Sequence, residues 1–206
     1  MRSVTWYFDF ISPYAYFGSH TLTRLGEGIE IRYQPILFAA LLNFWGQKGP
    51  AEMPTKRVWT YRSCIWWAKQ NNLPFRVPSV HPFNPLPYLR LAIAAGNSAA
   101  AVKTIFAALW TTGVDPADPR VIASLAESLD VPLDRIGAPD VKNSLREATE
   151  HATQKGVFGV PTLLIDEQLF WGNDAVDFAA EYLKDPAILD TAEMRAIDTL
   201  PVGASR

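Results

Sequence analysis

The sequence predicts an α/β protein in which two strand-bearing segments flank a long helical block. Two β-rich stretches near the N-terminus, residues 3–10 and 29–36, are separated by a helical pattern. Strand character returns only at residues 162–171, and one more helix follows. The predicted order is therefore β-α-β, a block of helices, and then β-β-α.

The first 36 residues read as one strand–helix–strand unit. The stretch SVTWYFDF is rich in β-branched and aromatic residues, which is typical of a buried strand. Ser12 and Pro13 are a favoured N-cap and first helical residue, and Gly26 and Gly28 end that helix. The stretch IEIRYQPI alternates apolar and polar residues as a strand does, and Pro35 ends it or places it at an edge. A unit this short favours a parallel pair of strands.

The middle of the chain is predicted to be helical. Five helices are expected, at residues 55–72, 84–96, 99–112, 119–129 and 139–155. Between the first two, the segment LPFRVPSVHPFNPLP holds five prolines, which indicates an extended rigid loop. We therefore expect a helical insertion domain at residues 37–156, between the two parts, 1–36 and 157–206, of a discontinuous domain.

The C-terminal part returns to the sheet. TLLI, residues 162–165, predicts a third strand, and QLFW pairs back on it as a hairpin around Asp166-Glu167. The last helix is expected from about Asn173 to Leu183. The tail after Lys184 is expected to be a short helix or loose.

The composition excludes several function classes. Of 206 residues, 49% are hydrophobic and 19% charged, and the net charge is −2 with no basic run, so no nucleic acid partner is expected. No stretch has the length of a membrane span, and the N-terminus lacks a secretory signal pattern. The lone cysteine, Cys64, lies between aromatic residues and is expected to be an inert, packed thiol. We expect a cytoplasmic protein with a small-molecule partner.

Three motifs, in this order and spacing, carry a resemblance to a known family: FDFISPYAY at 8–16, KGVFGVPTLLI at 155–165 and FWGNDA at 170–175. The two halves resemble the thioredoxin fold, and the inserted helices resemble those of bacterial disulfide oxidases and kappa-class glutathione transferases. Within that group the motifs are very similar to those of 2-hydroxychromene-2-carboxylate isomerases, over residues 4–183. The resemblance implies a thioredoxin-like fold with a large all-helical insertion, and a cis Pro161 that faces the start of the first helix.

The start of the first helix departs from the redox branch of this group. Disulfide oxidases carry Cys-x-x-Cys there, because one thiolate attacks and the second resolves. Here the positions read Ser12-Pro13-Tyr14-Ala15, so dithiol exchange is unavailable. Ser12 taken alone reads as an N-cap. A hydroxyl at the positive end of a helix is also suited to hold a thiolate that a ligand supplies, and the resemblance implies glutathione.

The resemblance extends the glutathione site to the second half of the chain. It assigns Val160, directly before Pro161, to the cysteinyl unit of the tripeptide. It assigns Gly172, Asn173 and Asp174 to the γ-glutamyl end, where Asp174 can pair with the ammonium group. An equally simple interpretation of Asn173-Asp174 is a helix cap.

Further candidates come from single residues. Gln47 stands where relatives usually have an asparagine near the glycyl end, and Lys56 matches a lysine of many relatives or is a solvated surface residue. Tyr14, Lys56 and Tyr88 are the candidate substrate contacts. The residues that could line an apolar acceptor pocket, or simply pack, are Tyr14, Phe44, Trp45, Phe83 and Tyr88. Trp59, Trp66 and Trp67 are expected in the core.

No histidine suggests a metal site or a Ser–His pair. His20 lies about 12 Å from Ser12 along the helix axis, which is too far for a dyad. His81 and His151 have no ligand partner at metal spacing.

Together these features predict a glutathione-dependent isomerase of a 2-hydroxychromene-2-carboxylate-like aromatic catabolite, in which Ser12 is the catalytic residue. A kappa-like glutathione transferase and a non-catalytic thioredoxin-fold binding protein are the alternatives. Because relatives often dimerise through the helical block, the chain could also form a homodimer.

Overall fold

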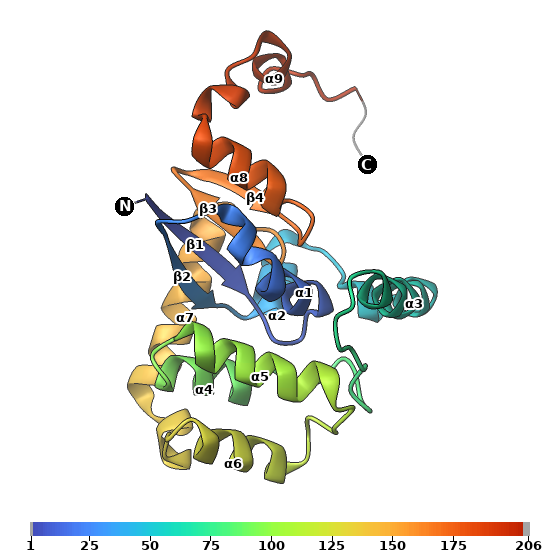
Figure 1. The fold of residues 1–206 in the computed structure, drawn as a ribbon, viewed down its shortest axis with the longest axis vertical. Coiled ribbons are helices and arrows are strands. Elements are labelled where there is room, and N and C mark those ends of the chain that lie inside the picture. The colour runs from blue at the N-terminus through green and yellow to red at the C-terminus, as the bar shows by residue number, and fades with distance from the viewer. Residues whose placement is uncertain (1, 204–206) are drawn as a thin grey trace.

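The computed structural model describes residues 2–203 and contains one four-stranded sheet with strand order β2-β1-β3-β4 (Figure 1). β1 (Arg2–Phe8) pairs in parallel with β2 (Ile29–Pro35) and antiparallel with β3 (Thr162–Ile165). β3 and β4 (Gln168–Trp171) form the predicted hairpin. The two halves of the chain therefore form a single sheet, which is joined between β1 and β3.

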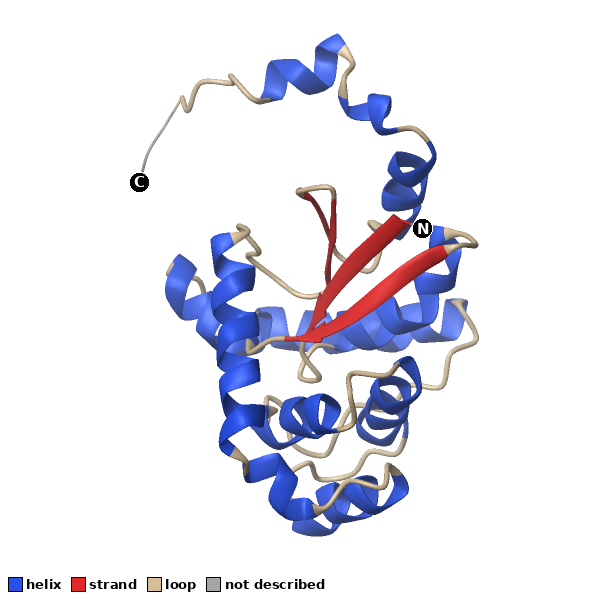
Figure 2. Ribbon diagram, turned by 90° about the vertical axis from the view of Figure 1, so that its left-hand side faces the viewer, coloured by secondary structure: helices blue, strands red, loops and turns tan. Residues whose placement is uncertain are grey.

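The five helices predicted in the middle of the chain are all present, and each of their ends lies within two residues of its expected place. The helices of the described chain are α1 (Pro13–Thr21), α2 (Phe38–Trp45), α3 (Pro54–Gln70), α4 (Leu86–Ala94), α5 (Ala99–Thr111), α6 (Pro119–Ser128), α7 (Pro139–Gln154), α8 (Val176–Lys184) and α9 (Ala192–Ile197). Figure 2 shows the sheet between helices, with the C-terminal segment that carries α9 extending away from it. None of the described helices is long and apolar enough to cross a bilayer.

Helices cover both faces of the sheet because β1 buries both of its faces. Val4, Trp6 and Phe8 are buried in a large core that they share with residues of α1, α5 and α8. Tyr7 points to the opposite face and packs with residues of α2 and α7, among them Leu41. Successive side chains of a strand alternate between the two faces of the sheet. A strand that is covered on both faces therefore needs a nearly continuous apolar run, as β1 has.

The helical block shares this large core. The ring of Phe106 on α5 packs on Trp6 and Phe8 of β1 with centroid distances of 6.2 and 5.7 Å. In Figure 1, α4, α5 and α6 lie beyond one end of the sheet, and α3 projects to the side. The division into a discontinuous domain and an insertion at 37–156 stays a prediction, and Met1 and residues 204–206, which it includes, lie outside the described residues.

The structure corrects the expectation that Trp59 and Trp66 of α3 are core residues, whereas Trp67 is half-buried and packs against the core as expected. Trp59 and Trp66 are 69% and 62% exposed. The helix packs through a narrow stripe of small residues one turn apart, Thr60, Cys64 and Ala68, which leaves little room for indoles on that face. Burial raises the pKa of the Cys64 thiol to about 12, which agrees with an inert thiol.

Trp110 on α5 links the helical block to the loop after β1. It is fully buried, and its indole N–H donates a 2.8 Å hydrogen bond to the Phe10 carbonyl. We expect Trp110→Phe to lower the free energy of unfolding by about 1–3 kcal/mol, because that carbonyl would stay buried without its donor. The same change at the exposed Trp66 should cost less than about 0.5 kcal/mol in urea unfolding. Equal effects of the two substitutions would contradict this role of Trp110.

Candidate active site

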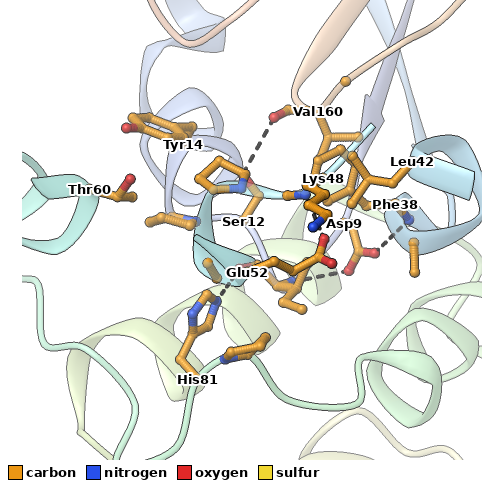
Figure 3. Close-up of a pocket in the computed structure, with 18 of the residues that line it drawn as sticks. Asp9, Ser12, Tyr14, Phe38, Leu42, Lys48, Glu52, Thr60, His81 and Val160 are labelled. Atoms are coloured by element: carbon orange, nitrogen blue, oxygen red, sulfur yellow. Dashed lines mark hydrogen bonds between the residues drawn. The ribbon is translucent and has the colours of Figure 1, made fainter. Parts of the chain in front are cut away.

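Ser12 lies at the N-terminus of α1, just beyond the end of β1. Its backbone is extended, and its Oγ accepts a 3.2 Å hydrogen bond from the Ala15 N–H, so it is an N-cap as expected. Its hydroxyl can also donate to the Val160 carbonyl at 3.4 Å, which is longer than the usual range of about 2.5–3.0 Å (Figure 3). The cap uses a lone pair of the oxygen, so the hydroxyl hydrogen is available to a ligand that lies closer.

Val160 reaches Ser12 from the other half of the chain. The Val160–Pro161 peptide bond is cis, as predicted from the resemblance. The Val160 N–H donates none of the hydrogen bonds found among the described residues. The Pro161 carbonyl accepts a 2.9 Å bond from the Gly172 N–H, which holds the Gly172–Asp174 segment beside it. Gly172 has φ +108°, a backbone conformation that favours glycine because residues with a Cβ rarely adopt it.

Two cavities share a wall at this place. The first has a volume of about 580 Å³, contains Ser12 and is mostly apolar, with Ile11, Phe38, Leu42, Phe83 and Phe158 among its lining residues. The second, of similar volume, is lined by Gly172, Asn173 and Asp174. Tyr14, Lys56 and Val160 line both cavities. The structure therefore brings residues of both halves of the chain around the end of α1.

Most of the predicted site residues lie in these walls. Gln47 lines the first cavity and is exposed, as is Lys56. Phe83 lines the first cavity too. Burial raises the pKa of the Tyr14 phenol, which stands between the two cavities.

Tyr88 is a correction, because it lies in the core and lines neither cavity. Its side chain is 1% exposed, and its hydroxyl donates a 2.7 Å hydrogen bond to the Pro116 carbonyl. Phe44 and Trp45 are also outside both cavities, with 63% and 42% exposure, and the Trp45 indole N–H donates a 2.9 Å hydrogen bond to the Val157 carbonyl. The assignment of Tyr88 as a substrate contact is therefore wrong. Of the two alternatives left open for these three aromatic residues, the structure does not support the acceptor pocket.

Asp9 is a site residue that the sequence analysis missed. It lines the first cavity, yet its side chain is fully buried. Its two carboxylate oxygens accept hydrogen bonds from the Ile11 N–H at 3.0 Å and the Phe38 N–H at 2.9 Å. Burial raises the pKa of this carboxyl to about 7, although both hydrogen bonds act in the opposite direction. An acidic residue inside the apolar run YFDF was the available signal, since a buried carboxylate is costly.

His81 is the second missed residue, and it lies in the wall of the same cavity. Its Nε2 is 2.7 Å from the Ile11 carbonyl, and its Nδ1 is 2.7 Å from the Tyr61 hydroxyl. A carbonyl only accepts, so Nε2 carries the proton and Nδ1 accepts from Tyr61. Burial lowers the pKa of the imidazole, which favours this neutral form. The proline-rich loop that carries His81 gave no signal of this contact.

The site and the sheet together define a class of protein. The structure combines a serine-capped helix, a facing cis proline and a thioredoxin-like sheet that is interrupted in sequence by helices. The family model of DSBA-like thioredoxin domains matches residues 3–184. The chain belongs to this family, which confirms the predicted thioredoxin-like fold with a helical insertion.

Within the family, particular relatives confirm the resemblance that the motifs indicated. The chain is 30% identical to the 2-hydroxychromene-2-carboxylate isomerase of Sphingobium xenophagum, over 89% of this chain and 99% of that protein. It is 24% identical to glutathione S-transferase kappa 1 of Homo sapiens, over 88% and 91% of the two chains. A solved structure of a 2-hydroxychromene-2-carboxylate isomerase matches with a TM-score of 0.75 and 26% identity, over 93% and 98%.

The buried Asp9 carboxyl predicts a pH-dependent stability difference. Its pKa is about 7 in the fold and 3.8 ordinarily, so between these pH values the folded state holds a proton that the unfolded chain releases. Wild-type stability from this group therefore falls as pH rises from 4 to 7. One pKa unit corresponds to about 1.4 kcal/mol. The free energy of unfolding of Asp9→Asn, relative to that of wild type, should therefore rise by on the order of 4 kcal/mol between pH 4 and pH 7.

Urea unfolding at several pH values measures this difference. The matched control is Asp115→Asn, because Asp115 is exposed and also accepts a hydrogen bond from the N–H two residues later, at 2.9 Å. A pH-independent difference between Asp9→Asn and wild type would show that the carboxyl titrates in the fold as it does in the unfolded chain.

Proposed function

We propose that this protein is a glutathione-dependent isomerase of an aromatic catabolite of the 2-hydroxychromene-2-carboxylate type. The observation that carries the proposal is Ser12, a hydroxyl and not a thiol, at a helix N-terminus that opens into an apolar cavity. Cys64, the one cysteine of the chain, is buried with a raised pKa and cannot replace it. A ligand must then supply the thiol, and the isomerase and kappa transferase relatives support glutathione.

The residues around Ser12 fit such a ligand. The Val160 N–H and C=O offer an extended peptide the pairing of a short strand, and the N–H has no other partner among the described residues. Asp174 is exposed at the second cavity and can pair with the γ-glutamyl ammonium. Gln47 and Lys56 lie at the first cavity, where an amide and an ammonium can bind the glycyl carboxylate.

Ser12 would act by binding the ionised form of the ligand's sulfur. Its hydroxyl donates a hydrogen bond, and the N-terminus of α1 adds positive potential. A fall of about two units in the thiol pKa is worth about 2.7 kcal/mol and turns a minor thiolate fraction at pH 7 into the major one. Bound glutathione supplies a thiolate that adds reversibly to a conjugated substrate, so that a double bond becomes a rotatable single bond.

The first cavity suits an aromatic substrate that carries a carboxylate. Phe38, Leu42 and Phe83 give it apolar walls. Two lysines, Lys48 and Lys56, line it as well. The acidic residues of its wall are Glu52 and the buried Asp9, whose pKa is raised to about 7 by burial. Action in the cytoplasm and formation of a homodimer stay predictions.

A kappa-like transferase is the second candidate, because a kappa transferase is among the relatives. Turnover of 2-hydroxychromene-2-carboxylate and of a chlorinated nitrobenzene, each with and without glutathione, separates the two functions. We expect isomerisation that requires glutathione without consuming it. Turnover of the nitrobenzene alone would favour the transferase, and calorimetry without any binding of millimolar glutathione would contradict both and favour a non-catalytic binding protein.

Substitutions of Ser12 test its two roles separately. Ser12→Ala should cost about 1 kcal/mol of stability through loss of the cap. It should also lower kcat/KM ten- to a thousandfold, equivalent to about 1.4–4 kcal/mol, because the thiolate loses its donor. Ser12→Gly is the matched variant, since glycine is a tolerable cap without a hydroxyl. A stable Ser12→Gly protein with wild-type activity would reduce Ser12 to a helix cap.

A further inference from the structure

The peptide group between Ile11 and Ser12 is held at both ends. The Ser12 N–H donates to the Asp9 carbonyl at 3.1 Å, and the Ile11 carbonyl accepts from His81 Nε2 at 2.7 Å. The Ile11 N–H, one peptide earlier, donates to the Asp9 carboxylate at 3.0 Å. Two consecutive peptide groups before Ser12 therefore have no free rotation, which fixes where the Ser12 Cβ and Oγ lie.

His81 is itself fixed by a separate element. Tyr61 on α3 donates its hydroxyl to His81 Nδ1, and the imidazole packs edge-on against the buried Trp110 at 5.3 Å. The tautomer and the ring orientation are thus both determined before His81 reaches Ile11. The hydrogen bond that holds Ser12 on this side comes from the helical block, 70 residues away in sequence.

Asp9 connects the Ser12 loop to the apolar wall of the cavity. Its second carboxylate oxygen accepts the Phe38 N–H at 2.9 Å, at the start of α2 (Figure 3). Phe38 and Leu42 of this helix line the cavity. One carboxylate therefore holds the backbone before Ser12 and the helix on which the substrate ring would lie.

Asp9 caps the start of α2, but no cation of the described chain stands beside its buried carboxyl group. Besides Asp9, the titratable groups in the wall of the same cavity are Tyr14, Lys48, Glu52, Lys56, Tyr61 and His81. None of these forms an ion pair or hydrogen bond with Asp9 among the described residues. A fully buried carboxylate without a cation destabilises a protein. Its place, three residues before Ser12 and in the wall of the cavity, points to a role in the site as well.

We propose that Asp9 and His81 are positioning residues that hold the Ile11–Ser12 peptide so that the Ser12 hydroxyl points at the glutathione thiolate. This inference rests on the proposed function. Neither side chain needs to touch the reacting atoms. Their effect is geometric, because a hydrogen bond weakens steeply when its angle falls. On an unrestrained loop the Ser12 hydroxyl would donate to the Val160 carbonyl or to water in place of the thiolate.

The experiment compares wild type with Asp9→Asn, His81→Leu and His81→Gln. In Asp9→Asn only the amide oxygen can accept a hydrogen bond, and the amide N–H faces one of the two backbone donors, the Ile11 or the Phe38 N–H, so one hydrogen bond is lost. Leucine removes the donor to the Ile11 carbonyl, whereas glutamine can replace it with an amide N–H. The matched controls are Asp115→Asn and His20→Gln, because both residues are exposed and lie outside the two cavities.

Three quantities are measured: the Kd of glutathione by calorimetry, the thiol pKa of bound glutathione from thiolate absorbance, and kcat/KM. Asp9→Asn and His81→Leu should raise the bound thiol pKa by about one unit and lower kcat/KM roughly ten- to a hundredfold. The Kd should stay within about threefold, since Val160 and Gly172–Asp174 are untouched. His81→Gln should recover most of the loss, and the controls should match wild type.

The outcomes separate this inference from the proposed function. If wild type binds glutathione and turns over, but Asp9→Asn and His81→Leu keep its thiol pKa and kcat/KM, the inference is wrong and the function stands. A loss of thermal stability in these variants without a change in thiol pKa would overturn it too, since it would show a merely structural role. Absence of glutathione binding by wild type would overturn both.

Tyr61→Phe covers the case in which His81→Leu does not fold. It keeps the ring on α3 but removes the hydroxyl that sets the His81 tautomer. We expect a smaller rise in thiol pKa than in His81→Leu, with about a three- to tenfold fall in kcat/KM. If His81→Leu does not fold, wild-type values of the thiol pKa and kcat/KM in Tyr61→Phe would contradict the role of His81.

Discussion

The antiparallel pairing of β1 with β3 is the interaction on which the site depends. It sets Tyr7 opposite Thr162, and so brings Ser12 within 3.4 Å of Val160, a residue 148 positions later. The entropic cost of closing a loop grows slowly with its number of residues, because each doubling of loop length adds only about 0.6 kcal/mol. The helical insertion can therefore be large without separating the halves, and it adds Phe83 and His81 to the cavity.

Capping and ligand binding are compatible in one hydroxyl because they use different parts of it. The Ser12 oxygen accepts from Ala15, as any N-cap does, and its hydrogen is only weakly committed to Val160. A cysteine at this position would bring its own redox chemistry, whereas a serine has no thiol and takes no part in dithiol exchange. Burial of the Asp9 carboxyl lowers the stability of the fold, and in our proposal the same carboxyl fixes the backbone that carries the Ser12 hydroxyl.

Contiguous features were predictable from sequence, and contacts distant in sequence were not. The strands and the five middle helices follow from local periodicity, and Val160, Pro161 and Gly172–Asp174 lie in continuous motifs. Helix α2 was missed because it has no local cap: its first N–H groups are satisfied by Asp9 and Thr149, which are 29 and 112 residues away. The contact of His81 with Ile11 spans 70 residues and has no periodic signal.

The exposed indoles of Trp59, Trp66 and Trp171 give the second cavity a built-in optical reporter. All three line that cavity, and Trp171 lies against Gly159, where a Cβ would stand 2.5 Å from its Nε1. A molecule that fills the cavity displaces water from these rings, which shifts the wavelength of their tryptophan emission. The buried Trp6 and Trp110 provide a constant background of fluorescence, so occupancy of the site can be followed without a label.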